Sequence, residues 1–463
     1  MNTFTDAVVN QEARTENNMA ARKSTANACV DLFFKIGASR GQDIIPGFVA
    51  ALVENEDVAL RIAQWARDVR GGAGERQLFR NILNYLETNR PECAVKLLTK
   101  IPEIGRWDDV FTFNTPELIT KAYSLLKDAL VAGNGLAAKW TPRKGHHAEE
   151  FRKFLSMSPK FYRKSLVALT RVVEQQMCSK DWDNINFSHV PSLASSRYKK
   201  AFTRHTEKFS EYVAALSSGD KTVKVNAGAV YPYDVLKGVS TYSNKTETDH
   251  IIAQWNALEN FVDDAKILPI VDVSGSMLLA NAAKSVSCLD VAVSLGLYLS
   301  EKNRGVFKDT FLTFSETPEL LNLKGNVIER LAQMKDSDWR MNTNLHRAME
   351  LILKTAIKGL VPQEEMPEML LILSDMQFDY CVEHDDSALK MVARKFAYAG
   401  YQLPKIVFWN LKAYNNVPVK FNTEGVALVS GFSPAIMKPL LSGKEFTPEA
   451  VMMHTVMIPR YDV

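Results

Sequence analysis

Apolar residues recur at three- and four-residue spacing through most of the first half of the chain. This is the period of an amphipathic helix, and short turns such as the glycine-rich residues 71–74 separate the periodic runs. The pattern predicts helices over residues 26–36, 43–53, 58–69, 77–87, 92–100, 117–131, 161–177 and 195–216. Because strand-like alternation is nearly absent, this half is expected to be an all-α array of helix pairs.

The hydrophobic pattern changes after one further predicted helix at residues 249–264. Short apolar runs then occupy residues 267–273, 310–314, 369–373, 405–411 and 425–430. They alternate with amphipathic segments at 286–301, 327–334, 345–357 and 387–398. Such alternation predicts a mostly parallel, Rossmann-like sheet with helices on both faces. Residues 320–323, soon after Pro318, are expected to add a short antiparallel edge strand.

The fold class predicted from these patterns is α plus α/β. A chain of 463 residues is too long for one ordinary core. We expect a flexible N-terminus over residues 1–20, a helical domain over 21–238, a small polar linker over 239–248 and the α/β domain over 249–463.

Composition points to a cytoplasmic protein. The chain is 46% hydrophobic and 24% charged, and no apolar run is long enough to span a bilayer. The polar N-terminal residues lack the apolar core of a signal peptide. Five widely spaced cysteines without a CxxC pair fit free thiols better than disulfides or a zinc site.

The charges are divided unevenly along the chain, although the formal net charge is only +3. Residues 1–245 carry 35 lysines and arginines against 26 acidic residues, whereas residues 246–463 carry 21 against 27. A basic half joined to an acidic half indicates that only the first half meets a polyanion.

A cluster of oxygen-bearing side chains follows the first predicted strand, where Asp272, Ser274 and Ser276 lie in the segment DVSGS. Thr343 lies in a polar loop directly before a predicted helix, and Asp375 follows another buried strand. Ligands of open α/β sheets bind beyond the carboxyl ends of the strands. We therefore expect these five side chains to form a metal site at one edge of the sheet.

The ligand types favour Mg²⁺, because hydroxyls with few carboxylates suit an ion that retains several waters. Ca²⁺ normally attracts more carboxylates, and zinc prefers His or Cys. Among divalent cations, Mn²⁺ and Ca²⁺ remain the alternatives to Mg²⁺. With few charged ligands the ion stays electrophilic. It is expected to accept a carboxylate or phosphate oxygen from a partner in an open position.

These five residues resemble the metal-ion-dependent adhesion site (MIDAS) of von Willebrand factor A domains. That site has an Asp-x-Ser-x-Ser segment, a Thr in a later loop and an Asp after the fourth strand. The resemblance implies that Ser274, Ser276 and Thr343 bind the metal directly, and that Asp272 and Asp375 bind it directly or through water.

Further segments, spread over nearly the whole chain, carry a second resemblance. They are RGG and GER within residues 70–76, GRWDD at 105–109, VPS at 190–192, SDMQFD at 374–379, VFWN at 407–410 and SGFS at 430–433. They resemble a family of unknown function that has a helical part followed by an A domain, and more distantly the Ro ribonucleoprotein (TROVE) family. In Ro proteins a ring of HEAT-like helix pairs, closed by an A domain, binds small structured RNAs and the ends of misfolded RNAs.

A basic stretch of the helical half is the candidate RNA-binding surface. Its first part consists of Lys139, Arg143, Lys144, Arg152, Lys153, Lys160, Arg163 and Lys164, and its second part of Arg197, Lys199, Lys200 and Arg204. Aromatic residues interleaved with the first part, such as Trp140 and Phe161, have the chemistry to stack on unpaired bases. The alternative is a solvated helix face whose aromatic residues belong to the core.

No Ser-His-Asp order, HExxH motif or paired-carboxylate motif stands out, so we do not expect an enzyme. The leading hypothesis is a binding protein that holds RNA or a ribonucleoprotein on its helices and an acidic protein partner at its metal site. The alternative is a protein–protein adaptor or assembly component, for example with a MoxR-type AAA+ ATPase, that has no RNA role.

Overall fold

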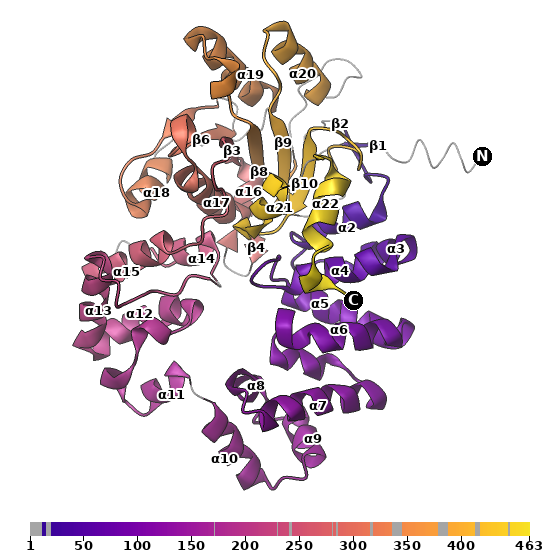
Figure 1. The fold of residues 1–463 in the computed structure, drawn as a ribbon, viewed down its shortest axis with the longest axis vertical. Helices are drawn as coiled ribbons and strands as arrows, with labels where there is room; N and C mark the ends of the chain where they lie inside the picture. Colours follow the sequence, from indigo (N-terminus) through magenta and orange to yellow (C-terminus); the bar gives the residue numbers. More distant parts are fainter. Residues whose placement is uncertain are drawn as a thin grey trace.

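The computed structural model describes residues 12–14, 20–170, 172–228, 230–239, 243–279, 281–283, 286–314, 318–335, 345–377, 388–412, 417–442 and 445–463. A helical part is followed by a six-stranded mixed sheet with helices around it (Figure 1). The predicted fold class, α plus α/β, is therefore confirmed.

The helical part contains α2 to α15 in the described residues. Their bounds are α2 Ala28–Ile36, α3 Ile45–Glu54, α4 Glu56–Arg67, α5 Arg76–Asn89, α6 Pro91–Ile104, α7 Pro116–Val131, α8 Gly135–Trp140, α9 His146–Phe154, α10 Pro159–Leu169, α11 Val173–Cys178, α12 Ser192–His205, α13 Glu207–Ser217, α14 Pro232–Leu236 and α15 Lys245–Asn256. Most of the predicted helices are present, with shifted ends. Asn55 separates the consecutive helices α3 and α4. It ends α3 in an extended conformation, and its side chain caps α4 by accepting a hydrogen bond from Val58 N.

Two predicted long helices are wrong, because a threonine interrupts each of them. The helix expected over 161–177 ends at Leu169, and Thr170 leaves the helical conformation. The helix expected over 195–216 is interrupted at Thr206, which is extended and caps α13 by accepting a hydrogen bond from Lys208 N. Threonine hydroxyls compete for backbone groups in this way, and periodicity alone does not register the interruption.

Regular secondary structure also occurs at the end of the predicted linker and within the predicted flexible N-terminus. Residue 245, inside the expected linker 239–248, begins α15, and the side chain of Asn244 caps that helix. The helix expected over 249–264 accordingly starts earlier and ends at Asn256. Near the N-terminus, β1 (Glu12–Arg14) pairs antiparallel with β2 (Ala20–Arg22).

The α/β part is built on a six-stranded sheet of order β10-β9-β8-β3-β6-β7. Its strands are β3 Ile267–Asp272, β6 Thr310–Phe314, β7 Leu320–Asn322, β8 Met369–Ser374, β9 Lys405–Asn410 and β10 Val426–Ser430. All neighbours are parallel except β7, which pairs antiparallel with β6 and confirms the expected edge strand. The small hairpin β4 (Asn281–Ala283) and β5 (Val286–Ser287) lies outside this sheet.

Helices accompany the sheet in the order expected for a doubly wound fold. They are α16 Gly275–Leu279, α17 Cys288–Lys302, α18 Val327–Lys335, α19 Leu345–Gly359, α20 Ala388–Tyr398, α21 Met437–Ser442 and α22 Pro448–Val456. Every residue of β3, β8 and β10 is buried, as a parallel sheet covered on both faces requires.

The helices of the first part follow an arc that leaves the α/β part on one side and returns to it on the other (Figure 1). On the outgoing side α2 packs against β10, and on the returning side the Trp255 indole donates a hydrogen bond to Glu301 of α17 at 2.9 Å. Between α10 and α11 one hydrophobic core gives way to a second, smaller one around Phe202 and Phe209.

A clasp of hydrogen bonds joins the end of α2 to the ends of β9 and β10. Ser430 Oγ donates to Phe33 O at 2.9 Å and accepts from Gly37 N at 3.0 Å, and Asn410 Nδ2 donates to Phe34 O at 3.2 Å. We call these five residues the clasp. The last carbonyls of α2 thereby find partners on the sheet, so the two parts share one continuous core.

Candidate functional site

The predicted metal-site residues that the structure describes meet at the carboxyl edge of β3 and β8, which are adjacent parallel strands. Asp272 ends β3 and Asp375 directly follows β8. Both carboxylates are fully buried. Ser374 Oγ donates a hydrogen bond of 2.5 Å to Asp272 Oδ2, which ties the two strand ends together. Thr343, the fifth predicted ligand, lies outside the described residues.

The two serines lie in the turn that leads from β3 into α16. Ser274 N donates to Asp272 Oδ1 at 2.9 Å, which folds the turn back over the end of the strand. The hydroxyl oxygens of Ser274 and Ser276 are 3.0 Å apart. Ser274 is buried whereas Ser276 is partly exposed, so the hydroxyl side of the cluster faces the surface.

Burial and a neighbouring carboxylate both disfavour the ionised form of Asp272. Burial, followed by the neighbouring Asp375 carboxylate, raises the pKa of Asp272 above its usual range. Among the ion pairs between described residues, none involves Asp272. The hydrogen bonds from Ser274 and Ser374 offset part of this cost, and a bound cation would offset more of it.

The turn after β8 is held in a strained backbone conformation. Met376 is buried and has a φ of 64°, a left-handed value that is uncommon for a residue with a side chain. Its N–H donates to Ser374 Oγ at 3.0 Å, the same hydroxyl that binds Asp272, and Gln377 N donates to Asp375 Oδ1 at 3.2 Å. Such strain is often found at functional sites.

The donor set fits a hard divalent cation. Within the residues that the structure describes, no group of three or more His, Cys, Asp or Glu side chains is arranged to hold a metal ion. The cluster offers two carboxylates and two hydroxyls instead, which are oxygen ligands that Mg²⁺ accepts alongside water.

Sequence reasoning missed the polar residues that extend the cluster across the sheet. Ser374 is in register with Asn410 on β9, and Asn410 is in register with Ser430 on β10. The row therefore runs from Asp272 to the clasp that holds α2. The signal was present in the sequence, because each of these residues ends a buried apolar run, but only strand order shows that they are neighbours.

The predicted RNA-binding residues are divided between the surface and internal contacts. Eight of them are exposed: Lys144, Lys153, Lys160, Arg163, Lys164, Arg197, Lys200 and Arg204. Three are partly buried and bonded within the protein: Lys139 to Glu174, Arg143 to Thr170 and Arg152 to Glu149. Lys199 is only 4% exposed, so its expected place on an exposed helix face is wrong.

Lys199 belongs to a buried polar cluster between α12 and α15. His250 Nε2 lies 2.8 Å from Ser195 Oγ, and burial, then the nearby Lys199 charge, lowers the pKa of His250 to about 4. Burial also lowers the pKa of Lys199, against the opposing effect of Glu247. Charged and polar groups packed in this way fix how the two helices meet, which explains why this lysine points inward.

The aromatic residues of the basic stretch are mostly part of the core, as the alternative interpretation holds. Phe151 and Tyr162 are buried, and Trp140 is covered by the Arg106 guanidinium at 3.7 Å from its ring centre. Phe161, on α10, is an exception with 58% of its surface exposed, and Phe154 is 37% exposed. Stacking on bases is therefore open mainly to Phe161.

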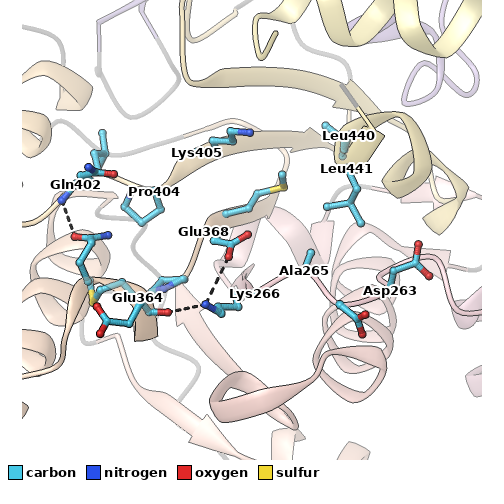
Figure 2. Close-up of a pocket in the computed structure, with 16 residues that line it drawn as sticks. Asp263, Ala265, Lys266, Glu364, Glu368, Gln402, Pro404, Lys405, Leu440 and Leu441 are labelled. Carbon is cyan, nitrogen blue, oxygen red and sulfur yellow. Dashed lines mark hydrogen bonds and ion pairs between the residues drawn. The ribbon is translucent and has the colours of Figure 1, made fainter. Parts of the chain in front are cut away.

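A separate pocket of about 850 Å³ lies at the opposite, amino edge of the sheet (Figure 2). Lys266, Glu368 and Lys405 line it, and they lie at the beginnings of β3, β8 and β9. Lys266 pairs with Glu368 at 3.6 Å and donates to the Glu364 carbonyl at 2.6 Å. Its lining also includes Asp263, Asp264 and Glu364, and the pocket lies at the edge of the sheet opposite to Asp272.

Comparison with known proteins identifies the family. The model described as "Domain of unknown function (DUF2828)" matches residues 15–110 and 131–266, and "Domain of unknown function (DUF7788)" matches residues 266–457. The chain belongs to the DUF2828 family. This family member is 30% identical to uncharacterized protein L728 of Acanthamoeba polyphaga mimivirus, over 96% of this chain and 86% of the relative.

The DUF2828 protein is also distantly similar in fold to a solved structure, the Ro (RSR) protein of Deinococcus radiodurans. The TM-score is 0.38 with 11% sequence identity, over 94% of this chain and 99% of the other. In the described part of the DUF2828 protein, no helix has the length and apolar character needed to cross a membrane.

Proposed function

We propose that this protein is a non-enzymatic binding protein with two binding surfaces. A Mg²⁺-dependent site of the von Willebrand A type engages an acidic group on a partner, and the basic helical arc binds RNA. The observation that carries the proposal is the pair of buried aspartates on adjacent strands, Asp272 and Asp375, beside two serine hydroxyls.

The residues that would hold the ion are Asp272, Ser274, Ser276 and Asp375, together with Thr343. The bound ion would supply a Lewis-acidic position for an oxygen of the partner. Ser374 orients the Asp272 carboxylate, and the clasp keeps the neighbouring strand ends in place. Ser276, which is partly exposed, marks the side from which a partner group would approach.

We expect excess Mg²⁺ to stabilise the protein against unfolding, by about 2.7 kcal/mol when the ion is at roughly 100 times its dissociation constant. Asp272→Asn should abolish this gain without lowering the stability of the metal-free protein, since it removes a buried charge beside Asp375. Thermal unfolding with Mg²⁺ or EDTA measures both effects. The control is Asp57→Asn, which alters an exposed carboxylate and should keep the full response. An equal Mg²⁺ response in the Asp272 variant excludes this metal site.

For RNA, the supporting observation is the exposed basic face of α10, where Phe161 lies among Lys160, Arg163 and Lys164. We expect single-stranded RNA to bind in filter-binding assays, with an affinity that falls steeply as salt rises. Replacing the three basic residues together by alanine should make the plot of log K against log salt shallower, reducing the magnitude of its negative slope by roughly two.

The matched control for that variant replaces Lys96, Lys121 and Lys127, which are exposed on α6 and α7 outside the basic stretch. It removes the same charge and should leave RNA affinity nearly unchanged. If both triple variants lose affinity equally, binding reflects net charge alone and the assignment to α10 fails. If RNA is not retained at low salt, the adaptor alternative is favoured.

A further inference from the structure

Two of the segments that resemble those of a known family meet in the helical part of the protein. The segment GER ends at Arg76, which is the first residue of α5. The segment GRWDD occupies residues 105–109, where the short 3-10 helix η1 (Trp107–Thr112) begins. Both α5 and α8 contact η1. Neither the proposed metal site nor the basic face of α10 uses these residues.

Arginines outnumber aspartates where these segments meet. Asp109 pairs with Arg67 and with Arg80, at 2.7 Å in each case. Asp108 pairs with Arg106 and, at 3.1 Å, with Arg80. Three guanidinium groups therefore share two carboxylates, and the cluster has an excess of positive charge before any further arginine is counted.

Arg76 adds a charge that no carboxylate balances. It is exposed, and it forms no ion pair with the residues that the structure describes. Glu75, the residue before it, is buried and pairs with Arg40 instead, at 2.6 Å. Partial loss of hydration, followed by the charges of Arg106 and Arg80, lowers the pKa of Arg76, and the smaller opposing effects of the two aspartates do not cancel those charges. The surroundings of Arg76 are thus positively charged.

The Arg106 guanidinium is held in place by an aromatic ring and one carboxylate. Its central carbon lies 3.7 Å from the ring centre of Trp140 on α8, and its Nε and Nη2 donate to Asp108. Its Nη1 has no hydrogen-bond partner in the described part of the chain, and 27% of the side chain is exposed. A guanidinium oriented in advance loses little side-chain entropy when it binds an anion.

We propose that Arg76 and Arg106 together bind a phosphate group. The planar fork of a guanidinium matches the oxygens of a phosphate, and a bound anion offsets the repulsion between arginines that lack a counter-charge. The same chemistry serves the backbone of an RNA chain or a small phosphorylated molecule. RNA as the source of the phosphate rests on the proposed function, whereas the phosphate site itself does not.

Thermal unfolding of the full-length protein tests the site, with inorganic phosphate as the probe. A ligand that binds only the folded state stabilises it, so potassium phosphate should raise the unfolding temperature above that in potassium chloride of equal ionic strength. The expected rise is roughly 1–2 °C at about ten times the Kd. Arg76→Gln should lose most of this rise and keep the unfolding temperature in chloride, because Arg76 is exposed and unpaired.

The matched control is Lys96→Gln, which removes an exposed positive charge from α6. It should keep the full response to phosphate. Phosphate also stabilises proteins generally, because it is excluded from their surfaces, and that effect is common to all three proteins. Equal responses in the wild type, Arg76→Gln and Lys96→Gln therefore overturn the proposal, as does the absence of any response.

Fluorescence anisotropy with a labelled single-stranded RNA identifies the source of the phosphate. If RNA supplies it, Arg76→Gln should weaken binding by about tenfold at low salt and reduce the magnitude of the salt slope by about 0.7, while Lys96→Gln changes little. Unchanged RNA affinity in an Arg76 variant that has lost its phosphate response assigns the site to a small phosphorylated molecule. Failure of the wild type to bind RNA, with its phosphate response intact, contradicts the proposed RNA role but supports this site.

Discussion

Asp109→Asn is expected to lower the free energy of unfolding by about 3–5 kcal/mol. The Asp109 carboxylate is fully buried and accepts hydrogen bonds from Arg67, Arg80 and the backbone N–H of Arg106, at 2.7 to 3.0 Å. Only 6% of the Arg67 side chain is exposed. An amide in place of the carboxylate leaves that guanidinium buried without its counter-charge, which is costly in a low-dielectric interior.

Urea unfolding followed by circular dichroism measures this loss. The control is Glu117→Gln, which removes the acidic partner of Lys121 from an exposed pair whose side chains are 78% and 47% exposed. Exposed pairs of this kind contribute roughly 0–1 kcal/mol. A loss for Asp109→Asn within that range would show that the buried Arg67 guanidinium does not require the charge of Asp109.

Gly37→Ala is expected to open the clasp and to destabilise the protein by about 3 kcal/mol or more, from forced overpacking and lost hydrogen bonds. A methyl group on Gly37 would lie 2.7 Å from Ser430 Oγ, 2.8 Å from the Ser430 carbonyl carbon and 2.9 Å from Gly431 N. Two of these neighbours are backbone atoms, so α2 must move away from β10. Limited proteolysis should then release the first helices faster than in the wild type.

The same substitution at Gly47 provides the control. Gly47 lies in α3, and a methyl group there meets nothing within 4 Å. Alanine at an open helical position stabilises by up to about 1 kcal/mol relative to glycine. If Gly37→Ala behaves like Gly47→Ala, the close approach of α2 to the sheet is not required for the fold.

Several segments that resemble those of a known family make structural contacts in this protein. Asp109 ends the GRWDD segment, and Asn410 and Ser430 belong to VFWN and SGFS. The Trp409 indole donates to Gly431 O at 2.7 Å, which fixes the backbone that faces Gly37. The glycines of residues 71–74 are likewise structural, since a methyl group on Gly72 would lie 1.8 Å from Trp65 O. The segments VFWN and SGFS therefore join the helical part to the sheet, whereas GRWDD and the glycine-rich turn stabilise the helical part itself.

The candidate metal site was more predictable from the sequence than the candidate RNA surface. Asp272 and Asp375 each end a continuous apolar run, and parallel strands place such ends at one edge. Lys199 and Arg204, in contrast, both lie on α12, yet only Lys199 is buried. Helical spacing gives relative directions around a helix axis. Which direction faces a neighbouring helix depends on packing from residues far along the chain.

By itself, the sequence determined the fold class, the order of the elements and the polar residues, such as Asp272 and Asp375, that lie at the carboxyl edge of the sheet. These features depend on local periodicity and on where an apolar run ends. The tertiary structure alone decided that Asn410 and Ser430 bind the end of α2 and that Lys199 is internal. Those outcomes depend on contacts between residues up to about 400 positions apart, whose free energies appear only once the strands are ordered and the helical arc has returned to the sheet.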